Sequence, residues 1–190
     1  MTQQHSELNK SAQGYVASFL NGEAFPGGFS FRTDLTKCNL DFSMDSLKRI
    51  DALLDYIRDN ISPQFETFID NPANQHFMHL IAFYAGQVAA KNAGLSPEWY
   101  SREEAIALVP QLKHLWPDDM FETSIICMVR PKGLHSLQYP PMLSVSHRLF
   151  TGEKSVWGSA QGFKLTADKP AQSSAPEGLF KKFRRILNGL

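Results

Sequence analysis

The sequence predicts an α+β fold, in which a small, mostly antiparallel sheet is packed by several helices around a buried central helix. Three observations lead to this prediction. The stretch 76–92 is apolar around most of a helical circumference, so other elements must cover it. Residues 47–61 carry apolar side chains at helical spacing, whereas 120–129 are rich in β-branched and aromatic residues. Helices and strands do not alternate regularly enough for a doubly wound parallel sheet.

The first half of the chain is expected to fold mainly into helices. In order, we expect a helix, a loop, two short strands, a capped helix and the central helix, at residues 6–20, 25–28, 29–32, 37–42, 43–61 and 76–92. Ser43 is the expected N-cap of the helix at 43–61, and Pro63 stops it. The apolar run of the central helix is shorter than the roughly 20 residues of a membrane span, and Gly94 is its expected C-cap.

The second half of the chain is expected to supply most of the sheet. In order, we expect a turn, a short helix, two strands, a helix, a turn and a last strand or surface cover, at residues 96–100, 101–109, 120–129, 134–139, 142–150, 152–158 and 163–165. Ser101 and Glu104 have the spacing of a capping box, which fixes the start of the short helix. Pro110 ends or bends it.

Composition divides the 190 residues into three parts: a globular domain at 1–165, a linker at 166–176 and a C-terminal helix at 177–190. The net charge of zero gives no reason to expect nucleic acid as a partner. Cys38 and Cys127 are expected to be buried free thiols, although the spacing leaves a disulfide open. The first residues lack the pattern of a secretory signal, so we expect a cytoplasmic protein.

Two histidines on the central helix are the candidates for a metal site. His76 and His79 are three residues apart and share a helix face, and Glu66, Asp70 or His114 is a candidate third ligand. The spacing is not that of a known metal motif, so we favour two solvent-facing histidines at the start of a buried helix. No metal, cofactor or catalytic residue is expected.

Other polar groups have a structural interpretation. Ser144, Ser146 and His147 lack a nucleophile-elbow motif, so they are expected to lie on a helix face. An acidic group at a turn is expected to be solvated, and so are four aspartates around the helix 43–61. These residues are Asp118, Asp119 and Glu122 at the turn, and Asp41, Asp45, Asp51 and Asp55 around the helix.

The C-terminal segment has the clearest pattern in the chain. Its apolar residues form one helical stripe, and its basic residues fill the other face. The stripe is Leu179, Phe180, Phe183, Ile186, Leu187 and Leu190, and the basic residues are Lys181, Lys182, Arg184 and Arg185. When these four basic residues are set aside, the chain carries 15 basic and 19 acidic residues, a net charge of −4. Three destinations stay open: the acidic body of the protein, a partner's groove, and an anionic membrane surface.

One part of the sequence resembles a known pattern. The run Leu40-Asp-Phe-Ser-Met-Asp-Ser-Leu-Lys-Arg-Ile-Asp51, followed by Phe83-Tyr-Ala-Gly86, is similar to small bacterial domains of unknown function. The likeness covers about residues 38–100, and Gln87 stands where those domains have an acidic residue. The resemblance implies a bacterial, cytoplasmic α+β domain and supplies no catalytic residues.

Together these patterns predict a non-enzymatic binding or accessory protein. Its C-terminal helix is expected to dock on a protein partner or on an anionic membrane surface, which gives a peripheral membrane location in the second case. The alternative is a metal-dependent or hydrolytic enzyme that uses His76 and His79. Formation of a homo-oligomer stays open.

Overall fold

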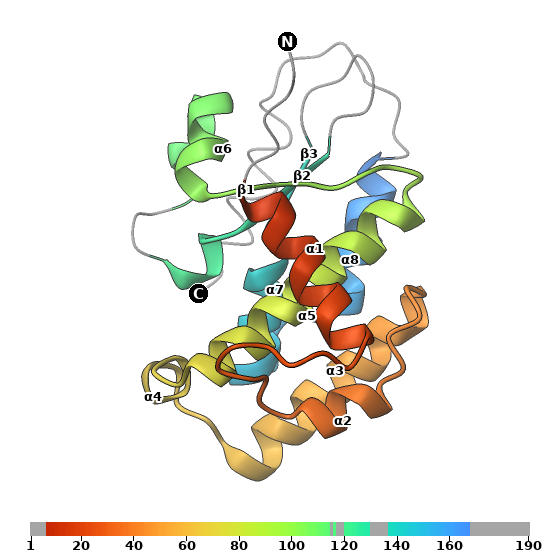
Figure 1. Ribbon diagram of the computed structural model, residues 1–190. Helices are drawn as coiled ribbons and strands as arrows, with labels where there is room; N and C mark the ends of the chain where they lie inside the picture. Colours follow the sequence, from red (N-terminus) through yellow and green to blue (C-terminus); the bar gives the residue numbers. More distant parts are fainter. Residues whose placement is uncertain (1–6, 115, 117–119, 130–136, 168–190) are drawn as a thin grey trace.

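The computed structural model describes residues 7–114, 116, 120–129 and 137–167. Within these residues the chain is mainly helical and has one three-stranded antiparallel sheet (Figure 1), so the predicted α+β fold is confirmed. In chain order the elements are α1 (Glu7–Leu20), α2 (Arg32–Lys37), α3 (Met44–Ile61), α4 (Phe65–Ile69), α5 (Pro72–Asn92), β1 (Glu98–Tyr100), α6 (Arg102–Leu108), η1 (Pro110–His114), η2 (Phe121–Thr123), β2 (Ile126–Val129), β3 (Leu137–Tyr139), α7 (Pro141–Phe150) and α8 (Val156–Ala167).

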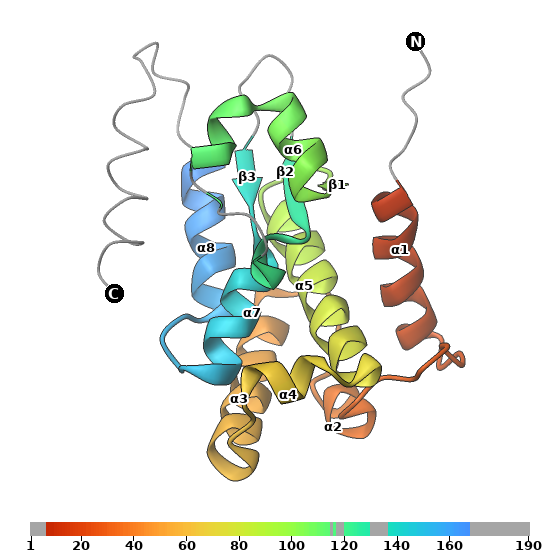
Figure 2. The ribbon, with the colours of Figure 1, turned by 90° about the vertical axis from the view of Figure 1, so that its left-hand side faces the viewer.

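Helix α5 is the buried centre of the fold, as the sequence predicts. Helices α1, α3, α4, α7 and α8 pack around it (Figures 1 and 2). It begins at Pro72 rather than His76, because Asn71 caps it by accepting the Ala73 N–H and proline is well suited to a first helical position. It ends where Gly94 takes a positive φ and the Leu95 N–H donates to the Ala90 carbonyl. Its buried residues are Phe77, Met78, Leu80, Ile81, Ala82, Phe83, Tyr84, Ala85, Gly86, Val88, Ala89 and Ala90.

Helix α3 has the boundaries and the buried stripe that the sequence predicts. The Ser43 hydroxyl accepts the Ser46 N–H at 3.1 Å, which caps the first turn. Ser62 ends the helix with a φ of 50°. The stripe packs against α5, α7 and α8, and consists of Leu47, Ile50, Leu53, Leu54 and Ile57.

The sheet has the strand order β1-β2-β3 and is covered on both faces. Trp99, Cys127 and Tyr139 are cross-strand neighbours on one face and belong to the main core around α5. Because side chains alternate along a strand, Ile126 and Met128 point to the opposite face. There they pack in a second, smaller core with Ala105 of α6, Leu112 of η1 and Trp116, which follows η1.

Two strands expected in the first half are wrong. Residues 29–32 and 37–42 form no strand; they are the turns on either side of α2. Phe31, Asn39 and Phe42 have φ values of 54°, 48° and 59°, and an extended strand requires negative φ. The alternation of apolar residues here comes from side chains that point inward from irregular backbone.

The second half also departs from expectation. Residues 120–129 are not one strand, because the Thr123 N–H turns back to the Met120 carbonyl and forms η2 before β2 starts. The expected strand at 134–139 is β3, which the structure describes from Leu137 on. Residues 163–165 lie within α8 and form no strand. Helix α4 and strand β1 have no counterpart among the elements expected from the sequence.

Both cysteines are free and buried, so the expectation for Cys38 and Cys127 is confirmed. Burial raises the pKa of both thiols above their ordinary value. Among the described residues, no helix has both the length and the apolar composition for crossing a membrane.

Candidate functional site

His76 and His79 lie on the face of α5 that meets α1, and each uses one ring nitrogen for a backbone contact. Nδ1 of His76 is 2.9 Å from the Gly28 carbonyl oxygen, and Nδ1 of His79 is 2.8 Å from the Gln75 carbonyl oxygen. A carbonyl oxygen only accepts, so Nδ1 carries the proton in both rings and donates it. Both side chains are half-buried, which corrects the expectation that they face solvent.

Aromatic rings from three other parts of the chain surround these imidazoles. Tyr15 of α1 contacts both, with ring centroids 5.8 Å from His76 and 6.2 Å from His79. The loop before α2 adds Phe25, 5.0 Å from His76, and η2 adds Phe121, 5.5 Å from His79. We call this set the histidine cluster; it comprises Tyr15, Phe25, Phe29, His76, His79, Phe83 and Phe121.

The histidine cluster does not have the arrangement of a metal centre. Burial lowers the pKa of His79, with the neighbouring His76 acting in the same direction, so the ring is neutral at neutral pH. The two imidazoles make no ring contact with each other, and the Tyr15 ring touches both. The three residues considered as a further ligand, Glu66, Asp70 and His114, are exposed. The described residues contain no group of three or more metal-ligating side chains.

The two serine hydroxyls considered for nucleophilic chemistry make structural hydrogen bonds, and Nδ1 of His147 is buried without a hydrogen-bond partner among the described residues. The Ser144 hydroxyl donates to the Pro141 carbonyl at 2.9 Å, one turn back on α7. The Ser146 hydroxyl donates to Oε1 of Glu122 at 2.9 Å, which ties α7 to η2. Nδ1 of His147 is 3.7 Å from a Glu153 carboxylate oxygen, and neither serine hydroxyl bonds to the imidazole. This arrangement lacks the hydrogen bond between nucleophile and base that catalysis requires.

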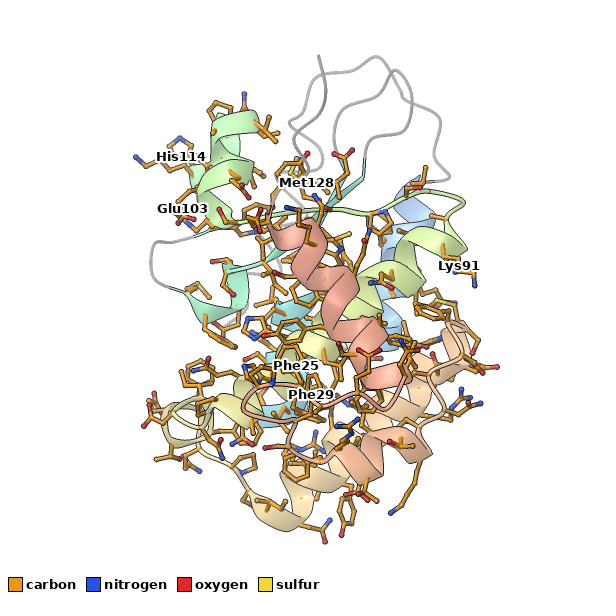
Figure 3. The ribbon with its side chains drawn as sticks, in the orientation of Figure 1. Phe25, Phe29, Lys91, Glu103, His114 and Met128 are labelled. Atoms are coloured by element: carbon orange, nitrogen blue, oxygen red, sulfur yellow. The ribbon has the colours of Figure 1, made fainter. Side chains whose placement is uncertain are left out.

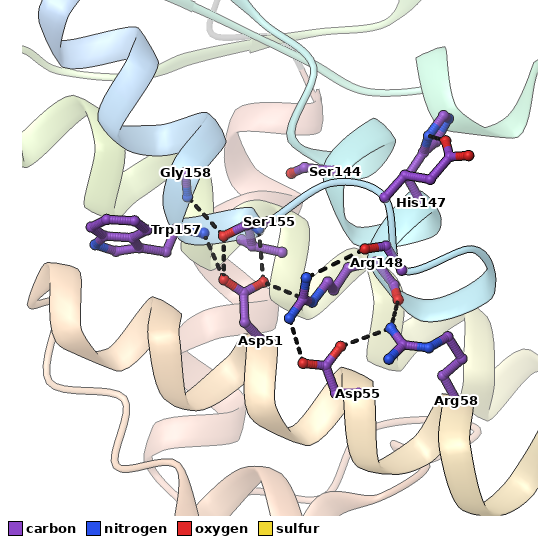
Figure 4. A network of polar contacts seen from close by, with 12 residues as sticks. Asp51, Asp55, Arg58, Ser144, His147, Arg148, Ser155, Trp157 and Gly158 are labelled. Carbon is purple, nitrogen blue, oxygen red and sulfur yellow. Dashed lines mark hydrogen bonds and ion pairs between the residues drawn. The ribbon is translucent and has the colours of Figure 1, made fainter. Parts of the chain in front are cut away.

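Asp51 corrects the expectation that the aspartates around α3 face solvent. It is only 7% exposed, and its carboxylate accepts three hydrogen bonds at the start of α8 (Figure 4). The donors are the Ser155 hydroxyl at 2.6 Å and the N–H groups of Val156 at 2.8 Å and Trp157 at 3.2 Å. A helix N-terminus has unpaired N–H groups and a partial positive charge, so the carboxylate caps α8 from α3.

Asp55 extends this network toward α7. One oxygen of its carboxylate accepts a hydrogen bond from the guanidinium of Arg148. The other oxygen accepts one from the guanidinium of Arg58 at 2.7 Å. Arg58 also donates to the Arg148 carbonyl at 2.9 Å (Figure 4). Asp51 and Asp55 therefore join α3 to α7 and α8, whereas Asp41 and Asp45 pair with Arg49 and Lys48 at the surface.

Two features of the sequence indicate the structural role of Asp51. Asp51 lies four residues after Leu47 and three before Leu54, so it falls on the buried stripe of α3. Ser155 and Gly158 also have cap spacing, and the Gly158 N–H donates to the Ser155 hydroxyl at 2.9 Å. A carboxylate on an apolar stripe, together with a capped helix elsewhere, indicates a polar contact between two helices.

A second buried polar contact fixes the turn before α3. The Phe42 N–H donates to the Tyr84 hydroxyl at 2.7 Å, and the Ser46 hydroxyl lies 2.7 Å from the same oxygen. Arg49 binds the Cys38 carbonyl at 2.6 Å and the Asn39 carbonyl at 2.8 Å. These bonds hold the positive-φ residues of the turn against α5 and α3, so their role is structural.

Several residues that the sequence singled out lie outside the described part of the chain. They are Asp118 and Asp119 of the acidic turn and the ten residues of the amphipathic stripe and its basic face, from Leu179 to Leu190. Glu122, the third acidic residue of that turn, is described and accepts the Ser146 hydroxyl, so it is not simply solvated.

Comparisons of the chain with protein-family models, curated proteins and solved structures found no match. The role of the candidate site therefore follows from the contacts that its polar groups make. In the part of the chain that the structure describes, the buried and half-buried polar groups singled out by the sequence hold helices and turns together. Asp51 caps a helix, Asp55 forms ion pairs between helices, and His76 and His79 pack among aromatic rings.

Proposed function

We propose that the protein is a non-enzymatic accessory protein that attaches to an anionic membrane surface through its C-terminal segment, residues 177–190. The observation that supports this proposal is the pattern of that segment in the sequence. Six apolar residues form one helical stripe, and the opposite face carries four cations and no acidic residue after Glu177. Helices that lie in the interface of a membrane have this combination of a basic face with a Phe- and Leu-rich stripe.

The free energy gained by such an attachment exceeds the cost of ordering the segment. Full burial of six large apolar side chains contributes roughly 9–18 kcal/mol by area, and partial burial and ordering of the segment remove about half of it. Each cation close to an anionic surface adds about 1 kcal/mol. The segment is too short to be a stable helix alone in water, so folding and attachment are coupled.

The chain between the described body and the C-terminal segment supports a membrane surface over self-docking. Outside the four cations the chain has a net charge of −4, so an anionic surface attracts the C-terminal segment and repels the body, but the acidic body attracts the same four cations, and charge alone does not separate these two destinations. Because α8 continues to Ala167, the linker is residues 168–176, which are rich in Ala, Ser and Pro and provide the reach that this separation needs.

The alternative, a metal-dependent or hydrolytic enzyme that uses His76 and His79, has no observation in its favour. Nδ1 of each ring contacts a backbone carbonyl, and aromatic side chains surround both imidazoles. A metal analysis of untagged protein tests this alternative directly.

Vesicle flotation of the full chain tests the proposal. We expect binding to phosphatidylcholine vesicles that contain about 30% phosphatidylserine, and weak binding to phosphatidylcholine alone. Two full-chain variants separate the two contributions. Replacing Phe180, Phe183 and Leu187 by Ser removes the apolar term, and replacing Lys181, Lys182, Arg184 and Arg185 by Gln removes the electrostatic one. Both variants are expected to remain in the vesicle-free fraction.

A matched control changes the same number of charges elsewhere. Lys10, Lys37, Lys48 and Lys113 are exposed, and their replacement by Gln is expected to leave flotation unchanged. Equal flotation of the wild type and the Ser variant, or no binding of the wild type to anionic vesicles, contradicts the proposal. The body of the protein and a partner's groove would then be the remaining destinations of the segment.

A further inference from the structure

Aromatic, methionine and lysine side chains form a continuous band on one side of the molecule. Nζ of Lys91, in the last turn of α5, lies 5.4 Å from the centroid of the Phe42 ring in the turn before α3. Nζ of Lys48 on α3 lies 5.1 Å from the centroid of the Trp157 ring at the start of α8. Met44 lies one helical turn before Lys48 and joins the two contacts. We call these five residues the aromatic–lysine band.

The apolar members of the band pack on the core and keep part of their surface exposed. Phe42, Met44 and Trp157 are half-buried, and the Phe42 ring rests on Tyr84 with centroids 5.1 Å apart. Lys91 is exposed and points away from the end of α5 (Figure 3). The ring of Trp157 points away from the polar network at the start of α8 (Figure 4). Half-exposed aromatic rings beside an ammonium group are typical of surfaces that meet a membrane–water interface.

The charges next to the band leave one cation in excess. Lys48 pairs with Asp45 at 2.8 Å, and Arg49 pairs with Asp41 at 3.1 Å, so these four charges cancel. Lys91 forms no ion pair with any of the residues that the structure describes, and its charge is not cancelled. These five residues therefore carry a net charge of +1, whereas the whole chain outside the four cations of the C-terminal segment carries −4.

The opposite end of the molecule is acidic. Helix α4 follows the C-terminal end of α3 and precedes the N-terminal end of α5, whereas the band lies at the other end of both helices (Figures 1 and 2). Residues 59–90 contain no lysine or arginine, and Asp59, Glu66 and Asp70 in this stretch are exposed. An anionic surface repels this acidic end whenever the two come within a Debye length of roughly 8 Å, so approach by the band is favoured.

The chain that leads to the C-terminal segment leaves the body near the band. The last turn of α8 lies at the same end of the molecule as the last turn of α5, which carries Lys91 (Figures 1 and 2). Residues 168–176 span at most about 30 Å, so a segment bound to a surface holds the body within that distance. Tethering of this kind gives effective concentrations on the order of mM, at which a contact too weak to act alone becomes populated.

We infer that the aromatic–lysine band is a second membrane contact, by which the body lies on the same anionic bilayer that residues 177–190 bind. The inference rests on the proposed function, because the segment has to hold the body near the surface. Phe42, Met44 and Trp157 enter the interfacial region of the bilayer, and Lys91 contacts the anionic head groups. The two contacts together fix the orientation of the body, with α4 facing the solution.

Tryptophan fluorescence of the full chain on vesicles tests the second contact. Trp99 and Trp116 are only 2% and 9% exposed, so Trp157 is the tryptophan that an interface reaches. The vesicles contain about 30% phosphatidylserine, and the phosphatidylcholine is either unmodified or carries bromine, a quencher of indole, on its acyl chains. We expect bromine to lower the emission of the bound wild type. This quenching is expected to be lost in Trp157→Phe and to persist in the control Trp116→Phe.

Vesicle flotation measures what the contact adds to binding. Lys91→Glu is expected to weaken binding of the full chain to the anionic vesicles about tenfold. Lys113 of η1 is also exposed, and η1 lies across the molecule from Lys91 (Figure 3). The matched control Lys113→Glu is therefore expected to bind with the affinity of the wild type.

The outcomes separate this inference from the proposed function. Three results overturn the second contact and leave attachment by the segment intact: a wild type that binds without quenching, undiminished quenching in Trp157→Phe, and equal affinities of Lys91→Glu and Lys113→Glu. A wild type that does not bind anionic vesicles overturns the attachment itself, and the second contact with it. The quenching of the wild type needs no variant, so the inference stays testable when a substitution impairs folding.

Discussion

Gly86 on α5 and Trp99 on β1 lie so close together that no methyl group fits between them. A Cβ atom placed on Gly86 would be 2.3 Å from Cη2 of Trp99 and 2.7 Å from Cζ2. The Trp99 ring is also held edge-on by Phe83, with centroids 4.9 Å apart. The glycine therefore determines how closely the sheet approaches the central helix.

Replacing Gly86 by Ala is expected to lower the free energy of unfolding by up to about 2 kcal/mol. Alanine gains about 1 kcal/mol in helix propensity, but overpacking against a buried ring costs about 1–3 kcal/mol, and the rigid indole is unable to move away. Urea unfolding monitored by circular dichroism measures the difference.

Gly14→Ala is the matched control, because Gly14 lies inside α1, is exposed and has no heavy atom near the added Cβ. It is expected to stabilise the protein by up to about 1 kcal/mol. A stabilised Gly86→Ala variant would show that Trp99 adapts to the methyl group and that the close approach is not required.

Asp51→Asn is expected to lower the free energy of unfolding by about 2–3 kcal/mol. The amide retains one acceptor oxygen, but its NH₂ group faces donors among Ser155, Val156 and Trp157, so at least one buried donor loses its partner. The control Asp45→Asn removes an exposed charge that pairs with Lys48 at the surface and is expected to change stability much less. Similar losses in the two variants would contradict the capping role of Asp51.

The prediction from sequence was accurate for regular helices and inaccurate for turns and for buried polar residues such as Asp51. Periodicity was sufficient for α3 and for the buried α5, because a long stripe or a fully apolar run determines both the element and its burial. It was not sufficient for the turns around α2, where Phe31 and Phe42 adopt positive φ. Those conformations depend on tertiary contacts, such as the bond from the Phe42 N–H to Tyr84, that a local pattern does not contain.

The polar groups of the candidate site were harder to predict for the same reason. His76 and His79 share a helix face, as their spacing predicts, yet their environment comes from Tyr15, Phe25 and Phe121 in distant parts of the chain. Phe163 was expected in a strand or surface cover because the apolar run around it is short. The carboxylate that caps the start of α8, Asp51, is about a hundred residues away in sequence, so no local pattern indicates that a helix begins there.

Tyr84→Phe is expected to lower the free energy of unfolding by about 1–2 kcal/mol, because it removes the acceptor of the Phe42 N–H and the partner of the Ser46 hydroxyl. Tyr56→Phe, at a side chain that is 60% exposed, is the control and is expected to change stability by less than about 0.5 kcal/mol. Calorimetry of the two variants decides the matter: a Tyr84→Phe variant as stable as Tyr56→Phe would mean that water replaces the hydroxyl.

His147 is expected to make the protein less stable in mild acid. Burial lowers the pKa of its imidazole, and the charge of Lys154 acts in the same direction, against smaller opposing effects of Glu153 and Glu122. The unfolded chain, with a histidine pKa of about 6.5, therefore binds a proton at a higher pH than the folded one. The free energy of unfolding falls as the pH drops below about 6.5 and through the folded pKa, by about 1.4 kcal/mol for each unit that separates the two values. Urea unfolding at a series of pH values should show a smaller acid loss in His147→Asn than in the wild type, and an unchanged loss in His114→Asn; an equally steep fall in all three proteins would assign the acid sensitivity to other groups.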